Sequence, residues 1–152
     1  MMDCTFQTER GNFNYRVGVI ITNGRKILMA RNPNEERAFY YSVGGRVRFG
    51  ESLTEAALRE LKEETGLAAE RFTLLTSLLT TPGFCTEKIA IYLAEGLSQG
   101  ETNPDEDEFL GLVRMPLDEA VDMVMRGDIR DGKTVAGLLM AKNVLEKRKE
   151  QA

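Results

Sequence analysis

Histidine is missing from the 152-residue chain, and cysteine occurs only as Cys4 and Cys85. Without histidine the chain has no Ser-His-Asp triad, no Cys-His pair and no histidine-rich zinc site. Two cysteines are too few for a disulfide framework, and no CxxC pair is present to bind zinc, so we expect two free thiols in a reducing compartment. Any acid–base chemistry must therefore come from carboxylates, Lys, Tyr, Cys or metal-bound water.

Long hydrophobic runs and an excess of positive charge are missing as well. No apolar stretch approaches the length of a membrane span, and the first ten residues lack the basic start and apolar run of a signal peptide. The formal net charge is -4, whereas a domain that holds a nucleic acid backbone is usually basic. We therefore expect a cytoplasmic protein that binds neither membranes nor nucleic acid. A small phosphorylated ligand, screened by a metal ion, fits this charge better.

The remaining composition, 42% hydrophobic and 29% charged residues, is that of a globular chain with enough bulk for one core. No repeat, low-complexity tract or linker interrupts the chain. We therefore expect residues 1–152 to form a single domain.

Apolar β-branched runs predict strands, and helical spacing of apolar residues predicts helices. The expected strands cover 15–22, 25–31, 39–43, 46–49, 72–80, 88–95 and 108–115, and the later helices cover 117–126 and 133–149. Asn23-Gly24 is expected to form the two-residue turn between the first two strands, and 96–107 a polar loop. Strands with interspersed helices indicate an α/β sandwich with a mixed β-sheet.

A further helix is predicted to begin at Ser52, because Ser52-Leu53-Thr54-Glu55 matches the capping-box pattern. Gly66 is expected to end it, as glycine commonly does just beyond the last helical turn. The apolar face that would pack on the core consists of Leu53, Ala57, Leu58 and Leu61.

Glu60, Glu63 and Glu64 share another side of this helix, at spacings of i, i+3 and i+4. Like charges at this spacing repel and weaken a helix. One interpretation is a solvated acidic face, partly relieved by Arg59 and Lys62. The other is an oxygen-rich site for a hard cation such as Mg²⁺.

The surrounding residues favour the cation site. Gly45 is followed after five residues by Glu51, and after seven more by the run Arg59-Glu60-Leu61, then Glu63-Glu64 and Gly66-Leu67. These residues match every defined position of the Nudix box, so the segment 45–67 resembles the Nudix hydrolase family. The resemblance implies the family's α/β/α sandwich and hydrolysis of a pyrophosphate bond.

The resemblance also implies roles for individual residues. Glu63 would lie beside the metal as a ligand or a base, Arg59 would orient the glutamates through ion pairs, and Glu51 would brace the loop. The ligands of Mg²⁺ or Mn²⁺ would be the carbonyl oxygen of Gly44 and the side chains of Glu60 and Glu64. Bound metal would neutralise charge and lower the pKa of bound water.

Three later segments resemble those of ADP-ribose pyrophosphatases within the family. The run 81–87, TPGFCTE, is similar to their SPGxxxE segment, 104–108 to their acidic loop, and 127–134, GDIRDGKT, to their GxIxDxKT segment. Each is weak alone, because Pro82-Gly83 is also an ordinary turn signal, the acidic run can be a solvated loop, and Asp131 can simply cap the last helix. Their order and spacing favour the resemblance.

This second resemblance supplies the remaining candidate residues. Glu106 would be a base and Glu108 a further metal ligand, both in a loop able to close over substrate. The expected substrate-binding residues are Arg31, Arg46, Pro82, Phe84 and Glu87.

The leading interpretation is hydrolysis of ADP-ribose to AMP and ribose 5-phosphate, or of a related nucleotide sugar. One alternative is a nucleoside triphosphate pyrophosphatase that removes oxidised nucleotides. Another is a regulator that binds a nucleotide without cleaving it, but a binding protein has no need of like charges that weaken a helix. The expected partner is a small-molecule nucleotide, and the resemblance also allows a homodimer.

Overall fold

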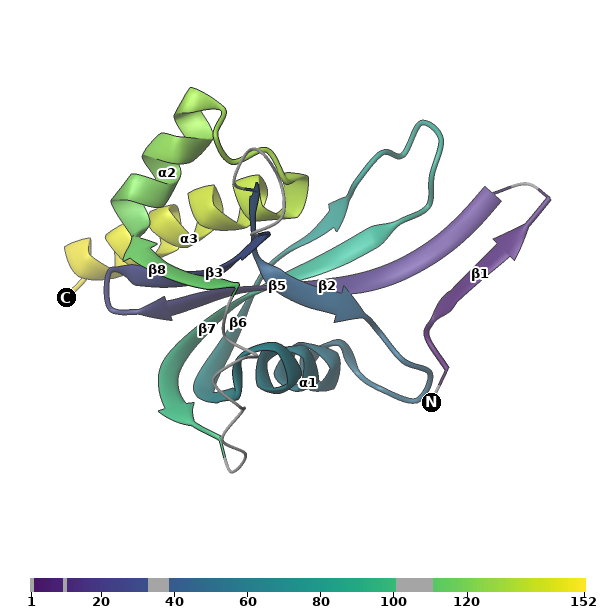
Figure 1. Cartoon of the computed structure of the whole chain (residues 1–152), viewed down its shortest axis with the longest axis horizontal. Helices are drawn as coiled ribbons and strands as arrows, with labels where there is room; N and C mark the ends of the chain where they lie inside the picture. Colours follow the sequence, from purple (N-terminus) through teal and green to yellow (C-terminus); the bar gives the residue numbers. More distant parts are fainter. Residues whose placement is uncertain (1, 10, 33–38, 101–110) are drawn as a thin grey trace.

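The computed structural model describes residues 2–9, 11–32, 39–100 and 111–152. The strands in this part of the chain are β1 (Thr5–Thr8), β2 (Gly11–Asn23), β3 (Lys26–Asn32), β4 (Phe39–Tyr41), β5 (Val43–Arg46), β6 (Leu67–Leu79), β7 (Lys88–Gln99) and β8 (Leu112–Pro116). The helices there are α1 (Leu53–Thr65), α2 (Leu117–Arg126) and α3 (Gly132–Glu150). The strands join in one sheet, with α1 on one face and α2 and α3 on the other (Figure 1). This confirms the predicted α/β sandwich with a mixed sheet.

Strand β2 organises the sheet. It pairs antiparallel with β1, β3 and β5 and parallel with β7. Successive side chains of a strand point to opposite faces, so β2 supplies both hydrophobic clusters. Val17, Val19 and Ile21 join the cluster beneath α1, whereas Ile20 joins the cluster beneath α2 and α3.

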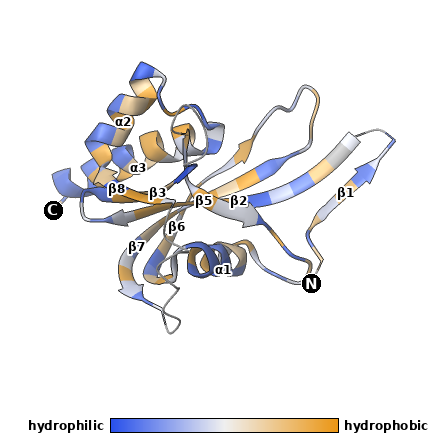
Figure 2. Ribbon diagram, in the orientation of Figure 1, coloured by the Kyte–Doolittle hydropathy of each residue, from blue (hydrophilic) through white to orange (hydrophobic). Residues whose placement is uncertain are grey.

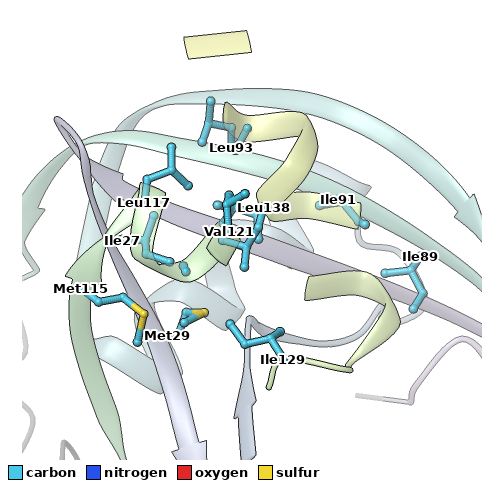
Figure 3. Packing of buried hydrophobic residues seen from close by; sticks show 13 residues of the cluster. Ile27, Met29, Ile89, Ile91, Leu93, Met115, Leu117, Val121, Ile129 and Leu138 are labelled. Carbon is cyan, nitrogen blue, oxygen red and sulfur yellow. The ribbon is translucent and has the colours of Figure 1, made fainter. Parts of the chain in front are cut away.

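Two hydrophobic clusters hold the helices on the sheet, and Figure 2 shows hydrophobic residues along the central strands between the helical layers. In the cluster shown in Figure 3, Leu138 of α3 and Val121 of α2 pack with Ile91 and Leu93 of β7. Among the described helices, none is both long and apolar enough to cross a membrane.

The N-terminal part of the sheet is larger than the sequence predicts. The strand expected over 15–22 is part of β2, which begins at Gly11, and β1 before it was not predicted. The run Thr5–Thr8 is mostly polar, so it shows no strand periodicity of its own. It is held by pairing with β2 and by stacking of the Phe6 and Phe13 rings, whose centroids lie 4.9 Å apart.

The first hairpin turn is one residue later than predicted. Asn23 pairs with Lys26, so the two-residue loop is Gly24-Arg25 rather than Asn23-Gly24. Gly24 has a φ of 62°, and Arg25 has no positive φ. A glycine at the first central position is the residue that a type II′ hairpin needs.

Several other boundaries also differ. The strand expected over 39–43 is interrupted at Ser42, and Gly44-Gly45 lies inside β5 instead of ending a strand. The strand expected over 46–49 is wrong: Arg46 ends β5, and Arg48 forms an isolated bridge with Asp3. The loop expected from Gly96 is wrong over its first residues, which continue β7 to Gln99 in pairing with β6.

Candidate active site

Helix α1 is fixed at both ends and along its inner face, as the sequence predicts. Its N-cap, Ser52, accepts from the Glu55 N–H at 3.2 Å, and the Glu55 carboxylate accepts from the Ser52 N–H at 2.7 Å. Gly66 ends the helix with a left-handed φ of 68°. Ala57 and Leu61 are fully buried against the sheet.

One member of the predicted apolar face is placed differently. Leu58 is 40% exposed, and the buried position beside Ala57 is taken by Ala56. The buried side of the helix is therefore turned toward Ala56, compared with the prediction. Because Glu60 lies one turn after Ala56 on the same side, this rotation brings Glu60 toward the sheet.

Two glycines let α1 and β2 approach β5. A Cβ atom on Gly45 would overlap the carboxylate of Glu60, and one on Gly44 would overlap the backbone carbonyl oxygen of Val17. Gly44 pairs with Gly18, and Gly45 with Val17, in the antiparallel register of β2 and β5. The glycine pair therefore makes room for a buried glutamate against the sheet.

Arg59 connects the acidic residues of this region. Its guanidinium donates to both carboxylate oxygens of Glu51, at 2.6 and 3.0 Å, and to the Arg46 carbonyl oxygen at 2.9 Å. It also donates to Glu60 at 2.6 Å and to Glu63 at 3.2 Å. Its hydrogen bond with Glu51 is the main reason that the pKa of Glu51 is lowered and that of Arg59 is raised. Arg59 therefore lies where the sequence hypothesis puts an orienting cation.

Glu60 and Glu64 form a close carboxyl pair. Glu60 is only 9% exposed. Burial, followed by the charge of Glu60 and a hydrogen bond between the two carboxyl groups, raises the pKa of Glu64 to about 7. The Gly44 N–H, which donates to Glu64, and the charge of Lys133 both act to lower this pKa. The pair is thus a concentrated negative charge that a proton or a cation stabilises.

Glu63 points elsewhere. Its side chain is 50% exposed and lies 3.2 Å from Arg59 Nη1 and 3.6 Å from Arg48 Nη1. Within the described ranges, no group of three or more Cys, Asp or Glu side chains is arranged to hold a metal ion. The glutamate helix therefore presents two converging carboxyl groups and a third held by arginines.

The chain is similar to known proteins over most of its length. A family model described as NUDIX domain matches residues 12–138. The chain belongs to the Nudix family. It is 40% identical over 121 residues to a methanol dehydrogenase activator from Bacillus methanolicus, in an alignment covering 77% of this chain and 65% of that relative. The chain thus spans just under two thirds of that relative's length.

The chain is also similar to one further relative in sequence and to one solved structure. The chain is 34% identical over 135 residues to an ADP-ribose pyrophosphatase from Bacillus subtilis (strain 168), covering 85% of this chain and 73% of that protein. A crystal structure of an ADP compounds hydrolase superposes with a TM-score of 0.75 and 28% identity, covering 89% of this chain and 74% of that one.

The loop after β6 in this Nudix chain forms the turn that the sequence predicts. Pro82 is exposed, Phe84 is 84% exposed, and the Phe84 and Cys85 N–H groups donate to the Thr81 carbonyl oxygen at 3.1 and 2.9 Å. Glu87 ends the loop and accepts from the Asn14 side-chain amide of β2 at 2.7 Å. The structure thus ties Glu87 to the sheet and leaves Phe84 open to solvent.

The other expected substrate residues lie on the strands. Arg31 of β3 stacks over the Tyr40 ring, with 5.9 Å from its guanidinium carbon to the ring centroid. Arg46 of β5 is exposed and lies 3.4 Å from Asp3. Glu106 and Glu108 lie outside the described residues.

A partly buried polar network at the start of α3 was not predicted. The carboxylate of Asp131 accepts from Lys133 Nζ at 2.7 Å and from the Thr134 hydroxyl at 2.5 Å. The Thr134 oxygen in turn accepts from the Ser42 N–H at 2.8 Å. Asp131 makes no side-chain hydrogen bond to the helix backbone, so it does not serve as a simple cap. The GxIxDxKT segment was the sequence signal for this network.

Proposed function

We propose that this chain is a divalent-metal-dependent pyrophosphatase that cleaves a nucleoside diphosphate linked to another group. ADP-ribose, or a related nucleotide sugar, is the proposed substrate. The observation that carries the proposal is the close Glu60–Glu64 pair, in which Glu60 is buried, held between Arg59 and the two glycines of β5. The names of the ADP-ribose pyrophosphatase and the ADP compounds hydrolase support the choice of substrate.

The residues present fit a hard divalent cation. Glu60 is buried, and burial together with the charge of Glu60 raises the pKa of the neighbouring Glu64, so nearby positive charge does not fully compensate the pair. Mg²⁺ prefers such oxygen donors. The residues that would hold the ion are Glu60, Glu64 and the carbonyl of Gly44. When bound, the ion supplies charge neutralisation of the diphosphate and a lowered pKa for attacking water.

The neighbouring residues of the chain keep this donor set in place. Arg59 engages one oxygen of Glu60 and both oxygens of Glu51, which limits the rotation of the Glu60 carboxylate. Glu51 also accepts from the Arg48 N–H at 2.9 Å, so the loop before α1 is braced by the same ion pair. Glu63, half exposed and paired with Arg59, is the proposed base that would accept a proton from water.

Hydrolysis is expected to stop when metal is removed. The negative charge of the Glu60–Glu64 pair repels a diphosphate unless a cation lies between the carboxyl groups and the phosphates. Excess EDTA should therefore abolish turnover, and added Mg²⁺ or Mn²⁺ should restore it. Activity is measured by release of AMP from ADP-ribose, and a titration of Mg²⁺ against thermal unfolding gives an independent signal of binding. Turnover that persists in excess EDTA would contradict the metal mechanism.

ADP-ribose is expected to be hydrolysed with a higher kcat/KM than nucleoside triphosphates. A panel of ADP-ribose, GDP-mannose, dGTP and oxidised dGTP, each with Mg²⁺, compares the two substrate classes, and chromatography identifies AMP and ribose 5-phosphate as products. If dGTP or its oxidised form is turned over far better than ADP-ribose, the nucleotide-cleaning alternative is the right one.

A further inference from the structure

Lys133 lies in the first turn of α3, in the helical layer opposite the glutamate helix (Figure 1). Its side chain is only 13% exposed, and its Nζ atom lies 2.7 Å from the Asp131 carboxylate. The same Nζ atom is 5.8 Å from the centroid of the Tyr41 ring on β4. A lysine is seldom buried to this extent unless its charge is paired, and Asp131 is the partner here.

The aliphatic stem of Lys133 lies against β2 at Gly18. Its Cδ atom is 3.6 Å from the position that a Cβ atom would take on Gly18. Gly18 is the partner of Gly44 in the β2–β5 register, and Gly44 is the residue whose N–H donates to Glu64. The absence of side chains at both glycines therefore lets a cation from α3 lie near carboxylates from α1.

A chain of hydrogen bonds fixes the lysine relative to β5. Asp131 accepts from both Lys133 and Thr134, and Thr134 accepts from the N–H of Ser42, two residues before Gly44. Thr134 is fully buried and Ser42 is 2% exposed. Lysine carries three N–H donors, and the hydrogen bond to Asp131 uses one of them. The ammonium group is thus held in place with donors left for a ligand.

We propose that Lys133 is a substrate-binding residue, whose ammonium group contacts the diphosphate from the α3 side of the sheet, and that Asp131 is its positioning residue. The substrate class rests on the proposed function. The negative charge of a diphosphate is repelled by the nearby carboxyl pair, so binding needs positive charge from the protein or from metal. A fixed lysine is well suited to neutralise the phosphate that faces away from the glutamates.

The test compares Lys133→Met and Lys133→Arg with Lys142→Met. Lys142 lies on the same helix and forms an ion pair of 3.2 Å with Asp118, so its removal controls for loss of charge and of an ion pair on α3. Two quantities are measured with Mg²⁺: the KM for ADP-ribose, and the Kd of an α,β-methylene analogue of ADP-ribose, determined by calorimetry. The analogue has a carbon bridge and cannot be hydrolysed, so its Kd is independent of turnover.

Lys133→Met is expected to raise both the KM for ADP-ribose and the Kd of the analogue by about 10- to 100-fold. A change of this size corresponds to the loss of one charge-assisted hydrogen bond. Lys133→Arg should recover part of this loss, and Lys142→Met should stay within about two-fold of the parent. A Kd for Lys133→Met equal to that for Lys142→Met would overturn the proposal.

The role of Asp131 is tested by a double-mutant comparison. Asp131→Asn should weaken analogue binding in the parent and add little in the Lys133→Met background, because it acts through the lysine. Equal losses in both backgrounds would show a structural role only.

The two proposals fail in different ways. If the parent neither binds the analogue nor cleaves ADP-ribose, the substrate assignment fails. The Lys133 comparison is then made on whichever diphosphate the substrate panel identifies. If the parent cleaves ADP-ribose and Lys133→Met matches the control, only the lysine proposal fails.

Discussion

Glu64→Gln is expected to lower kcat by about 100-fold or more while the fold persists. Replacing a residue that only orients a metal ligand typically lowers metal affinity or activity by about 10- to 100-fold. Glu64 is proposed as a ligand itself, so its replacement should lower activity at least as much. Burial and the neighbouring Glu60 already raise the pKa of Glu64, so its charge opposes folding when no metal is bound. In EDTA, at a pH above about 7, the Gln variant should therefore unfold at a temperature no lower than that of the parent.

The measurements are steady-state kinetics on ADP-ribose with saturating Mg²⁺ and thermal unfolding in EDTA. Glu119→Gln is a suitable control, because Glu119 is an exposed glutamate in the first turn of α2, in the opposite helical layer. It should leave kcat within about two-fold of the parent. A near-normal kcat for Glu64→Gln would show that Glu64 is not a ligand. A large fall in its unfolding temperature would show that the carboxylate is mainly structural.

Local signals in the sequence predict the glutamate helix well. The capping box at Ser52 and the glycine at Gly66 each depend on residues a few positions apart, and both appear in the structure as predicted. The spacing from Gly45 to Glu64 places the carboxyl groups on one helix face. What the sequence pattern does not give is the rotation of that face, which buries Glu60 and leaves Glu63 with Arg48 and Arg59.

Contacts between distant segments are not predictable from such signals. Thr134 bonds to Ser42 across 92 positions, and Asn14 bonds to Glu87 across 73. The residues that neighbour each of these four positions in the sequence do not indicate its partner. Strand β1 was missed for the same reason, because its stability comes from pairing with β2 and not from its own apolar pattern.

Gly45→Ala is expected to lower kcat/KM by about 100-fold and to destabilise the fold by about 1–3 kcal/mol. The added methyl group would occupy the place of the Glu60 carboxylate, so either that carboxylate turns away or α1 moves off β5. A displacement of about 1 Å at a catalytic group can cost about 100-fold in rate. Gly45 does not have a positive φ, so the expected cost comes from the contact and not from backbone strain.

This account is tested by removing the group that the methyl would meet. In a Glu60→Ala background the same Gly45→Ala change should cost little stability, because the space beside residue 45 is then open. Activity should not return, since the ligand is lost. Gly132→Ala serves as the matched control: a Cβ atom there meets nothing within 4 Å, and its φ is not positive. That variant should unfold at or slightly above the parent's temperature, because alanine restricts the unfolded chain more than glycine does. Equal destabilisation by Gly45→Ala with and without the Glu60 carboxylate would mean that Gly45 is required for the path of β5 and not for seating the glutamate.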